Sequence, residues 1–548
     1  MALSRRSLLR GCAGVGAAGA TIWPLTASAA RFRGGLLSDP FTLGVASGDP
    51  EPDGFVLWTR LAPTPLAEDG LGGMPNTNIL VEWELAVDDR CHGVVRRGTV
   101  IARPELAHAV HVELYDLQPG REYFYRFRAD GYISPIGRTR TAPEPWATVS
   151  ALSMSFTSCH YFEHGYFTAY RHLAADEPDL VLHLGDYVYE YPAGTYPLPG
   201  GNPRDHEGPE TRTLANYRQR YAQYKTDPDL QAAHAVAPWA VVFDDHEVEN
   251  NWADEVPERP DPEFLARRAA AFQAYFENLP LRRSSIPRGI DMQLYRRLLW
   301  GRLATFHLLD TRQYRDDQVC GDGYKDCPAA LDTARSITGA EQEKWLLDGF
   351  HSSTARWDVL AQQVFFAQRD SNQGPERVVS MDAWDGYAAS RDRITRAWVE
   401  AGVRNPVVLT GDVHAHWAAE LKLDYADPTS RTVGTELACS SITSNGDGVD
   451  VVGGNHPWAA WNPHLRFYNN QRGYVRTTFT PDLLTADFQV VPYVTQPGAP
   501  LHTRATFVIE DQVPRLHQIA DHPTPGSPSR RATADLGAAT MRQETARP

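Results

Sequence analysis

Hydrophobic and polar residues alternate in short runs over about residues 41 to 141. The clearest runs are FVLWTR (55–60), ILVEWELAV (79–87), HAVHVELYDL (108–117) and EYFYRFRA (122–129). Glycine, proline and aspartate separate them, which is typical of an antiparallel β-sandwich. The segment LQPGREYFYR places Tyr123 as in the tyrosine corner of immunoglobulin-like folds. We therefore predict an immunoglobulin- or fibronectin-like sandwich over 31–145, with a structural role.

A different pattern follows a linker at 141–150. Short, nearly continuous apolar runs alternate with helical patterns such as Pro262 to Glu277, which predicts an α/β domain over 146–515 whose sheets are covered on both faces. Sites in such folds gather at the carboxyl ends of strands, so polar residues at those ends should converge. These residues are Cys159, Asp186, Asp244, Asp245, His246, Asp310, Asp412, His414 and His416.

The two ends of the chain differ from its middle. Arg5 and Arg6 precede a mildly apolar stretch and a small-residue cleavage site, Ala27-Ser28-Ala29. This pattern predicts a twin-arginine signal peptide over 1–30, export of the folded protein by the twin-arginine translocase, and a periplasmic or secreted location. The stretch is too rich in glycine and alanine for a stable membrane span. Apolar periodicity is lost from about Leu516, which predicts a disordered tail over 516–548.

Composition and net charge limit the classes of partner that the protein is expected to bind. The chain has 548 residues, 42% of them hydrophobic, and a formal net charge of -15. Such a charge argues against nucleic acid as a specific partner. A small phosphate ester stays possible because local cations can outweigh the overall field. We expect a monomer.

Six cysteines are few for this length. Cys320 and Cys327 lie in the polar segment CGDGYKDC, and in an oxidising compartment this spacing predicts a local disulfide. A metal-binding loop is the alternative, and the lack of a nearby histidine counts against it.

Each strand-end residue is weak evidence for a site when taken alone. An aspartate there is often a helix cap, a cysteine is often a packed thiol, and His414 and His416 could simply share one face of a strand. Several such residues in one domain strengthen the hypothesis. A cation beside Asp186 would also offset the cost of burying its charge.

The chain resembles the PhoD-like alkaline phosphatases from about Phe41 to about Ile509. The resemblance rests on FTLGVASGDP, FVLWTRLAP, TSCH, LGDYVYE, YRQRYAQYKTDPDLQ, DDHEVENNW and LTGDVHAHW. It implies a four-layer α-β-β-α metallophosphatase domain behind the immunoglobulin-like sandwich. It also implies a ferric ion with neighbouring calcium, and hydrolysis of phosphate monoesters and diesters by attack of a metal-bound hydroxide.

The same resemblance implies an iron side of the site. Cys159 in TSCH and Tyr189 in GDYVYE match the thiolate and the phenolate that bind the iron. His414 in GDVH matches the iron-binding histidine, and Asp186 matches the aspartate that bridges iron and calcium.

On the calcium side, Asp412 matches a carboxylate ligand and Asp245 matches the position of an asparagine on the second metal of related enzymes. Asn216 in LANYRQRY is a further candidate ligand. His246 matches the motif histidine near the leaving group, which makes it the candidate catalytic residue. Ligand chemistry agrees, because calcium prefers oxygen ligands and the thiol lies on the other side of Asp186.

Two histidines depart from the family pattern. His160 follows Cys159 where a glutamine-like residue is expected, and we interpret it as a solvated loop histidine. His416 adds an imidazole close to His414 and is left outside the metal set.

Two other functions fit parts of the sequence. A phospholipid-acting phosphodiesterase of the same family, similar to a phospholipase D, would share the ligand set and differ in its substrate pocket. A secreted metal-binding protein without catalysis would show ligand shells with no open position.

Overall fold

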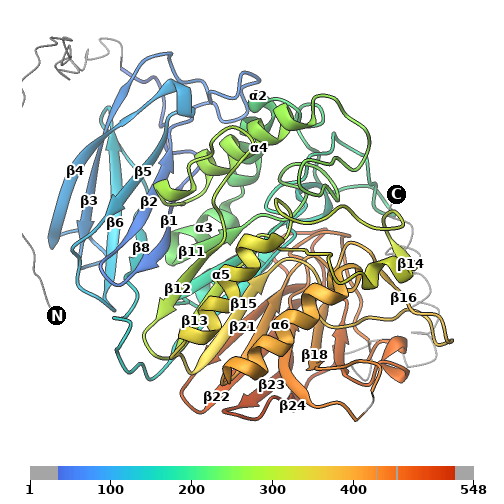
Figure 1. Ribbon diagram of the computed structural model, residues 1–548. Helices are drawn as coiled ribbons and strands as arrows, with labels where there is room; N and C mark the ends of the chain where they lie inside the picture. The colour runs from blue at the N-terminus through green and yellow to red at the C-terminus, as the bar shows by residue number, and fades with distance from the viewer. Residues whose placement is uncertain (1–34, 428, 452–454, 525–548) are drawn as a thin grey trace, which may run out of the picture.

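The computed structural model describes residues 35–427, 429–451 and 455–524 (Figure 1). The predicted signal peptide over 1–30 lies outside these residues, as does the last part of the predicted tail. None of the helices within the described ranges is long and apolar enough to cross a membrane.

The largest sheet has ten strands in the order β24-β23-β22-β21-β9-β10-β11-β1-β2-β5. The strands β9, β10 and β11 are parallel neighbours at its centre. In chain order its strands are β1 (Val45–Glu51), β2 (Gly54–Arg60), β5 (Ala109–Leu114), β9 (Leu152–Thr157), β10 (Leu180–Leu184), β11 (Pro238–Val242), β21 (Arg472–Phe479), β22 (Leu483–Val491), β23 (His502–Glu510) and β24 (His517–Asp521).

A second sheet has seven strands in the order β12-β13-β15-β17-β19-β18-β20. Its strands β13, β15, β17 and β19 are parallel. The strands are β12 (Arg296–Trp300), β13 (Ala304–Leu308), β15 (Trp357–Gln362), β17 (Pro406–Thr410), β18 (His416–Lys422), β19 (Thr432–Ala438) and β20 (Leu465–Asn469).

Two smaller sheets complete the set in the described part of the chain. One joins β14 and β16, and the other has the order β4-β3-β6-β7 with β8 paired to β6. Their strands are β3 (Ile79–Ala86), β4 (Val94–Ala102), β6 (Glu122–Ala129), β7 (Tyr132–Ile133), β8 (Gly137–Arg140), β14 (Tyr324–Asp326) and β16 (Val378–Ser380).

Helices cover the two large sheets. The α-helices are α1 (Thr168–Ala175), α2 (Leu214–Lys225), α3 (Pro228–Val236), α4 (Phe264–Asn278), α5 (Gly339–Ser352) and α6 (Ala388–Ala401). Alternation along β15 shows how the layers pack. Val359 and Ala361 join the core shared with the ten-stranded sheet, whereas Leu360 packs with residues of α5 and α6 on the other face. The predicted four-layer α-β-β-α architecture is confirmed.

The N-terminal sandwich shares a sheet with the α/β region (Figure 1). Its core packs β3 and β6 against β2 and β5, for example Phe127 and Val81 with Leu57. The strand β1 also pairs in parallel with β11, Ser47 opposite Pro238. A sandwich edge is thus paired, which removes an exposed strand edge. The predicted boundary near residue 145 therefore does not separate two independent sheets.

The predicted start of the disordered tail at Leu516 is wrong. Leu516 is buried in the main core, and β24 pairs with β23 with Thr506 opposite Ala520. β24 is an edge strand whose side chains are mostly exposed, so it needs no alternation of apolar and polar residues. Sequence periodicity could not detect such a strand.

The tyrosine corner at Tyr123 should contribute to the stability of the sandwich. The hydroxyl of Tyr123 accepts a hydrogen bond of 3.1 Å from the backbone N–H of Gln118. Tyr123→Phe should lower the free energy of unfolding by about 0.5–1.5 kcal/mol and leave turnover unchanged. Urea denaturation measures the change, with Tyr115→Phe as a control at an exposed tyrosine. Equal stability of the Tyr123 variant and the native protein would show that the corner contributes nothing.

Candidate metal centre

The candidate ligands follow four strands at the point where each strand ends. Cys159 follows β9, Asp186 follows β10 and Asp245 follows β11, three parallel neighbours of the first sheet. Asp412 and His414 follow β17 of the second sheet. The site therefore lies where carboxyl ends of strands from both large sheets meet.

The backbone at these positions is unusual. Cys159, Asp186 and Asp412 each have φ of 58°, and His414 has φ of 51°. This left-handed conformation costs a residue other than glycine about 1–2 kcal/mol. Such strain clusters at functional sites, where the surrounding structure enforces it. Four strained residues lie among the candidate ligands. This indicates that the surrounding structure enforces these turns and thereby positions the side chains.

The first ligand cluster comprises Cys159, Asp186 and His414. Each of these buried residues offers a ligand atom, and these atoms all lie within 4.8 Å of one another. The Tyr189 hydroxyl donates to Asp186 Oδ2 at 2.9 Å and lies 3.3 Å from His414 Nε2. It also lies 2.7 Å from Ser444 Oγ. A thiol, a carboxylate, an imidazole and a phenol thus meet at one point.

The second ligand cluster comprises Asp186, Asp245 and His246. Their ligand atoms also lie within 4.8 Å of one another, and all three side chains are buried. Asp186 belongs to both clusters. A single carboxylate has two oxygens, so it can serve two neighbouring cations.

Burial makes this arrangement costly without a cation. It raises the pKa of the Asp186 carboxyl well above its usual value, and the nearby carboxylates of Asp245 and Asp244 add to the effect while His246 opposes it. Burial and the charge of Asp186 likewise raise the pKa of the Cys159 thiol. Asp186 Oδ1 is buried and has no hydrogen-bond partner among the described residues. An orphaned oxygen between two ligand clusters fits a bound metal ion.

Two buried residues, Glu247 and Arg312, connect the loops that follow the strands. Glu247 Oε1 accepts a hydrogen bond from the Tyr187 N–H and Oε2 accepts one from the Asp244 N–H, which joins the loops after β10 and β11. Arg312 donates to Asp244 at 2.6 Å and pairs with Asp382 through two hydrogen bonds of 2.7 and 2.9 Å. These contacts leave the guanidinium of Arg312 engaged, so it is not available to a substrate.

His246 has a carboxylate partner. Its Nδ1 lies 2.8 Å from Glu190 Oε2, and both side chains are buried. Burial opposes a charge on the imidazole, but Asp245, Glu190 and Asp186 outweigh it and hold the pKa of His246 well above its usual value. With Nδ1 committed to Glu190, Nε2 is the nitrogen that can act on a bound molecule.

A cavity of about 210 Å³ opens onto the centre. Asp412 and His414 line it together with Tyr324, Arg369 and Asn445. Asn445 Nδ2 lies 3.1 Å from His414 Nδ1. Asp412 and His414 are therefore accessible from one side, and a catalytic metal site requires such an open side.

Not every predicted residue reaches the centre. Asn216 is the N3 residue of α2, where its side-chain oxygen accepts from the backbone N–H and the hydroxyl of Thr213 in a capping box. The structure thus uses its side-chain oxygen to cap the helix. Asp310 also acts locally and accepts from the N–H groups of Arg312 and Gln313.

The two additional histidines are both fully buried. His160 contacts the Tyr170 hydroxyl and the Tyr187 carbonyl, so the interpretation of a solvated loop histidine is wrong. Its neighbours on three packed segments exclude water, a feature that the residue order does not reveal. His416 Nδ1 accepts from the Ser440 N–H, and burial lowers the pKa of His416 to about 3. It belongs to neither ligand cluster.

Sequence reasoning missed Glu190, Ser444 and Asn445. Glu190 was part of a recognised motif, but no spacing rule links it to His246. Ser444 and Asn445 follow β19 in the segment CSSITSNG. A polar run after a buried strand is the same pattern that points to Asp186, so it also marks this loop as part of the candidate site.

The paired sheets and the open strand-end ligand clusters define a metallophosphatase fold. Comparison with known proteins agrees. The profile of the PhoD-like phosphatase family matches residues 154–488, and that of its N-terminal domain matches residues 27–143. The chain is 49% identical to alkaline phosphatase D of Bacillus subtilis (strain 168) over 486 residues, 88% of this chain and 83% of that protein.

A solved structure of PhoD also matches, with a TM-score of 0.87 and 47% identity, over 94% of this chain and 99% of that one. The chain belongs to the PhoD-like phosphatase family. This family is metal-dependent, and within residues 35–427, 429–451 and 455–524 the two clusters that share Asp186 are groups that could hold metal.

Asp186 allows a test of the shared-ligand arrangement. Asp186→Asn should lower kcat/KM by at least about 100-fold, because a ligand common to two clusters contributes several kcal/mol. The metal-depleted variant should be at least as stable as the metal-depleted native protein, since a buried charge is removed. Elemental analysis and calorimetry with and without added metal measure these effects.

Asp424→Asn, at an exposed aspartate, is the matched control. If Asp186→Asn kept its metal content and its metal-dependent rise in Tm, Asp186 would not be a ligand.

Proposed function

We propose that the chain is an exported, metal-dependent phosphoesterase that hydrolyses phosphate monoesters and diesters. A ferric ion would be held by Cys159, Tyr189, Asp186 and His414, and calcium would be held by Asp186, Asp245 and Asp412. The observation that carries this proposal is the position of Asp186 in both ligand clusters. The similarity to alkaline phosphatase D supports the substrate class.

The donor sets differ on the two sides of Asp186. Thiolate, phenolate and imidazole lie together on one side, which suits a trivalent transition metal. On the other side Asp245 lies with His246, and Asp412 belongs to neither cluster but lines the adjoining cavity. Asp245 and Asp412 offer oxygens, which suit calcium. When bound, such cations supply Lewis acidity and activate the attacking water.

The chain's own residues would position the substrate and move protons. Asp186 belongs to both clusters and Asp245 to the second. Glu247 connects the loops that carry these two residues. His246 would protonate the leaving oxygen through Nε2, because Glu190 holds Nδ1. Glu190 is therefore a positioning residue.

Export is supported by two features. Arg5 and Arg6 form the twin-arginine pattern, and the Cys320–Cys327 disulfide, predicted from the sequence, is present. Structural disulfides persist mainly in oxidising compartments. A folded, metal-loaded protein is the form that the twin-arginine translocase carries.

The direct test is turnover on a substrate panel combined with metal analysis. Purified protein should release phosphate from a monoester and cleave bis(p-nitrophenyl) phosphate, and a chelator should abolish both activities. Selective cleavage of phosphatidylcholine would instead support the phospholipase D-like alternative. Bound metal without hydrolysis of any ester would support a binding protein.

Iron can be tested by colour. Electrons of a phenolate or thiolate bound to ferric iron can be promoted into empty iron orbitals, so the oxidised protein should absorb visible light. Tyr189→Phe should shift or weaken this band and lower activity. Tyr196→Phe, at a partly exposed tyrosine, should leave the spectrum unchanged. A colourless, iron-free preparation with full activity would reject iron.

The role of His246 predicts a dependence on the leaving group. His246→Asn should lower turnover of β-glycerophosphate by about 10²–10⁴-fold, because an alkoxide needs a proton to leave. Loss on p-nitrophenyl phosphate should be at least about tenfold smaller, since its leaving group is already stable. His351→Asn, at an exposed histidine, is the control. Equal losses on both substrates would argue that His246 binds the phosphate or a metal instead.

A further inference from the structure

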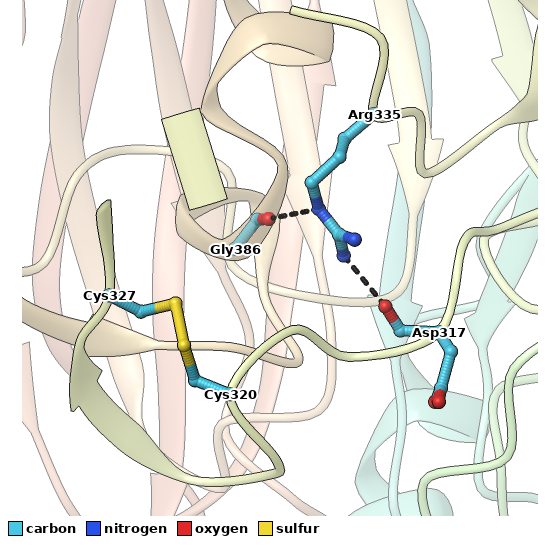
Figure 2. The surroundings of a disulfide bond; sticks show 5 residues. All are labelled: Asp317, Cys320, Cys327, Arg335 and Gly386. Atoms are coloured by element: carbon cyan, nitrogen blue, oxygen red, sulfur yellow. Dashed lines mark hydrogen bonds between the residues drawn. A yellow bond between two sulfur atoms is a disulfide. The ribbon is translucent and has the colours of Figure 1, made fainter. Parts of the chain in front are cut away.

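The Cys320–Cys327 disulfide closes a loop that forms part of the cavity wall (Figure 2). Asp322 and Tyr324 lie within this loop and line the same cavity as Asp412 and His414. The loop is thus part of the site, although it lies far from the strand-end ligands in the sequence.

Contacts hold the loop 320–327 and the chain segments beside it. Figure 2 shows Arg335 donating to the carbonyl oxygens of Asp317 and Gly386, at 2.8 and 3.3 Å. On the other side β14 pairs with β16, and the Met381 N–H donates to the Gly323 carbonyl at 2.9 Å. The disulfide joins the two ends of this anchored segment.

The loop is connected to the metal centre through Asn251. The Asn251 side-chain amide donates to Asp322 Oδ2, and the Asn251 backbone N–H donates to Asp245 Oδ2 at 2.8 Å. Gln318 also donates to the Asn251 carbonyl at 2.8 Å and to Asp382 Oδ1 at 2.8 Å. Asn251 is thereby held through its side chain and its carbonyl.

The backbone of Asn251 needs this support. Its φ is 48°, a left-handed conformation that asparagine adopts more readily than most residues but still at a cost. Asp322 supplies one of the two contacts that hold Asn251, and Gln318 supplies the other. The hydrogen bond from Asn251 to Asp245 is thus linked to a loop whose shape the disulfide restricts.

Asp322 holds the loop and Asn251 through both of its carboxylate oxygens. Its Oδ1 accepts from the Gly323 N–H at 2.6 Å, and its Oδ2 accepts from Asn251. Both oxygens are therefore engaged in fixing the loop and Asn251.

We propose that the disulfide-closed loop 320–327 positions Asp245 through Asp322 and Asn251, and so sets the affinity of the site for its calcium-side cation. This inference rests on the proposed role of Asp245. It also assigns a function to oxidation: closing the Cys320–Cys327 bridge completes the calcium side of the site.

The test compares calcium binding in four variants of the full-length protein. These are the double variant Cys320→Ser/Cys327→Ser, Asp322→Ala, Asp322→Asn and Asp326→Ala. Asp322→Asn keeps an oxygen that can accept from Asn251. Asp326→Ala removes an exposed carboxylate of the same loop and serves as the control.

The calcium concentration for half-maximal activity, and that for half of the calcium-dependent rise in Tm, should increase about 3- to 10-fold in the double variant and in Asp322→Ala. This is less than the 10- to 100-fold effect of groups that bond a ligand directly, because Asp322 acts through Asn251. Asp326→Ala should resemble the native protein, and Asp322→Asn, which keeps one of the two acceptor oxygens, should lie between the native protein and Asp322→Ala. At saturating calcium, kcat should fall less than about threefold in all variants.

Two outcomes would overturn the proposal in different ways. If the double variant and Asp322→Ala lost stability but kept native calcium affinity, the bridge would only stabilise the loop. If calcium altered neither activity nor Tm of the native protein, the calcium assignment of the proposed function would fall as well.

Discussion

Desolvation of the Asp186 carboxylate is the constraint on which the site depends. Asp186 is buried beside Asp244 and Asp245, and one of its oxygens has no hydrogen-bond partner within the described residues. An ion so placed is costly unless an opposite charge meets it. A cation on each side of Asp186 would offset that cost, with thiol, phenol and the His414 imidazole on one side and Asp245 with His246 on the other.

The fold supplies the rigidity that this arrangement requires. Two covered sheets bring their strand ends together, so candidate ligands from distant parts of the chain meet on short, strained turns. Glu247 fixes two of the turns to each other, and the Arg312–Asp382 pair fixes a third segment beside them. Rigid supports keep ligands in place without reorganisation when a metal or substrate binds.

The sequence predicted the parts of this design that follow from local pattern. A buried strand that ends in a polar residue identified Cys159, Asp186, Asp245 and His414, because parallel strands end at one edge of a sheet. The sequence pattern gave a wrong prediction where a residue's role depends on hydrogen bonds that only the three-dimensional structure shows. The motif position of Asn216 suggested a ligand, yet Thr213 beside it forms a helix cap.

Other features were out of reach for the same reason. The pairing of β1 with β11 joins segments far apart in the chain, and β24 is an exposed edge strand without apolar alternation. The link from the disulfide loop to Asp245 passes through Asn251 by hydrogen bonds that no sequence spacing encodes. Three-dimensional contacts, and not residue identity, assign these roles.

The most direct measurement is crystallographic. Diffraction data from protein purified without chelator, collected above and below the iron absorption edge, locate iron by anomalous difference density. The account predicts one iron peak in contact with Asp186, Cys159, Tyr189 and His414, and a second cation without iron signal in contact with Asp186 and Asp245. Density for a single cation that does not contact Asp186 would contradict it.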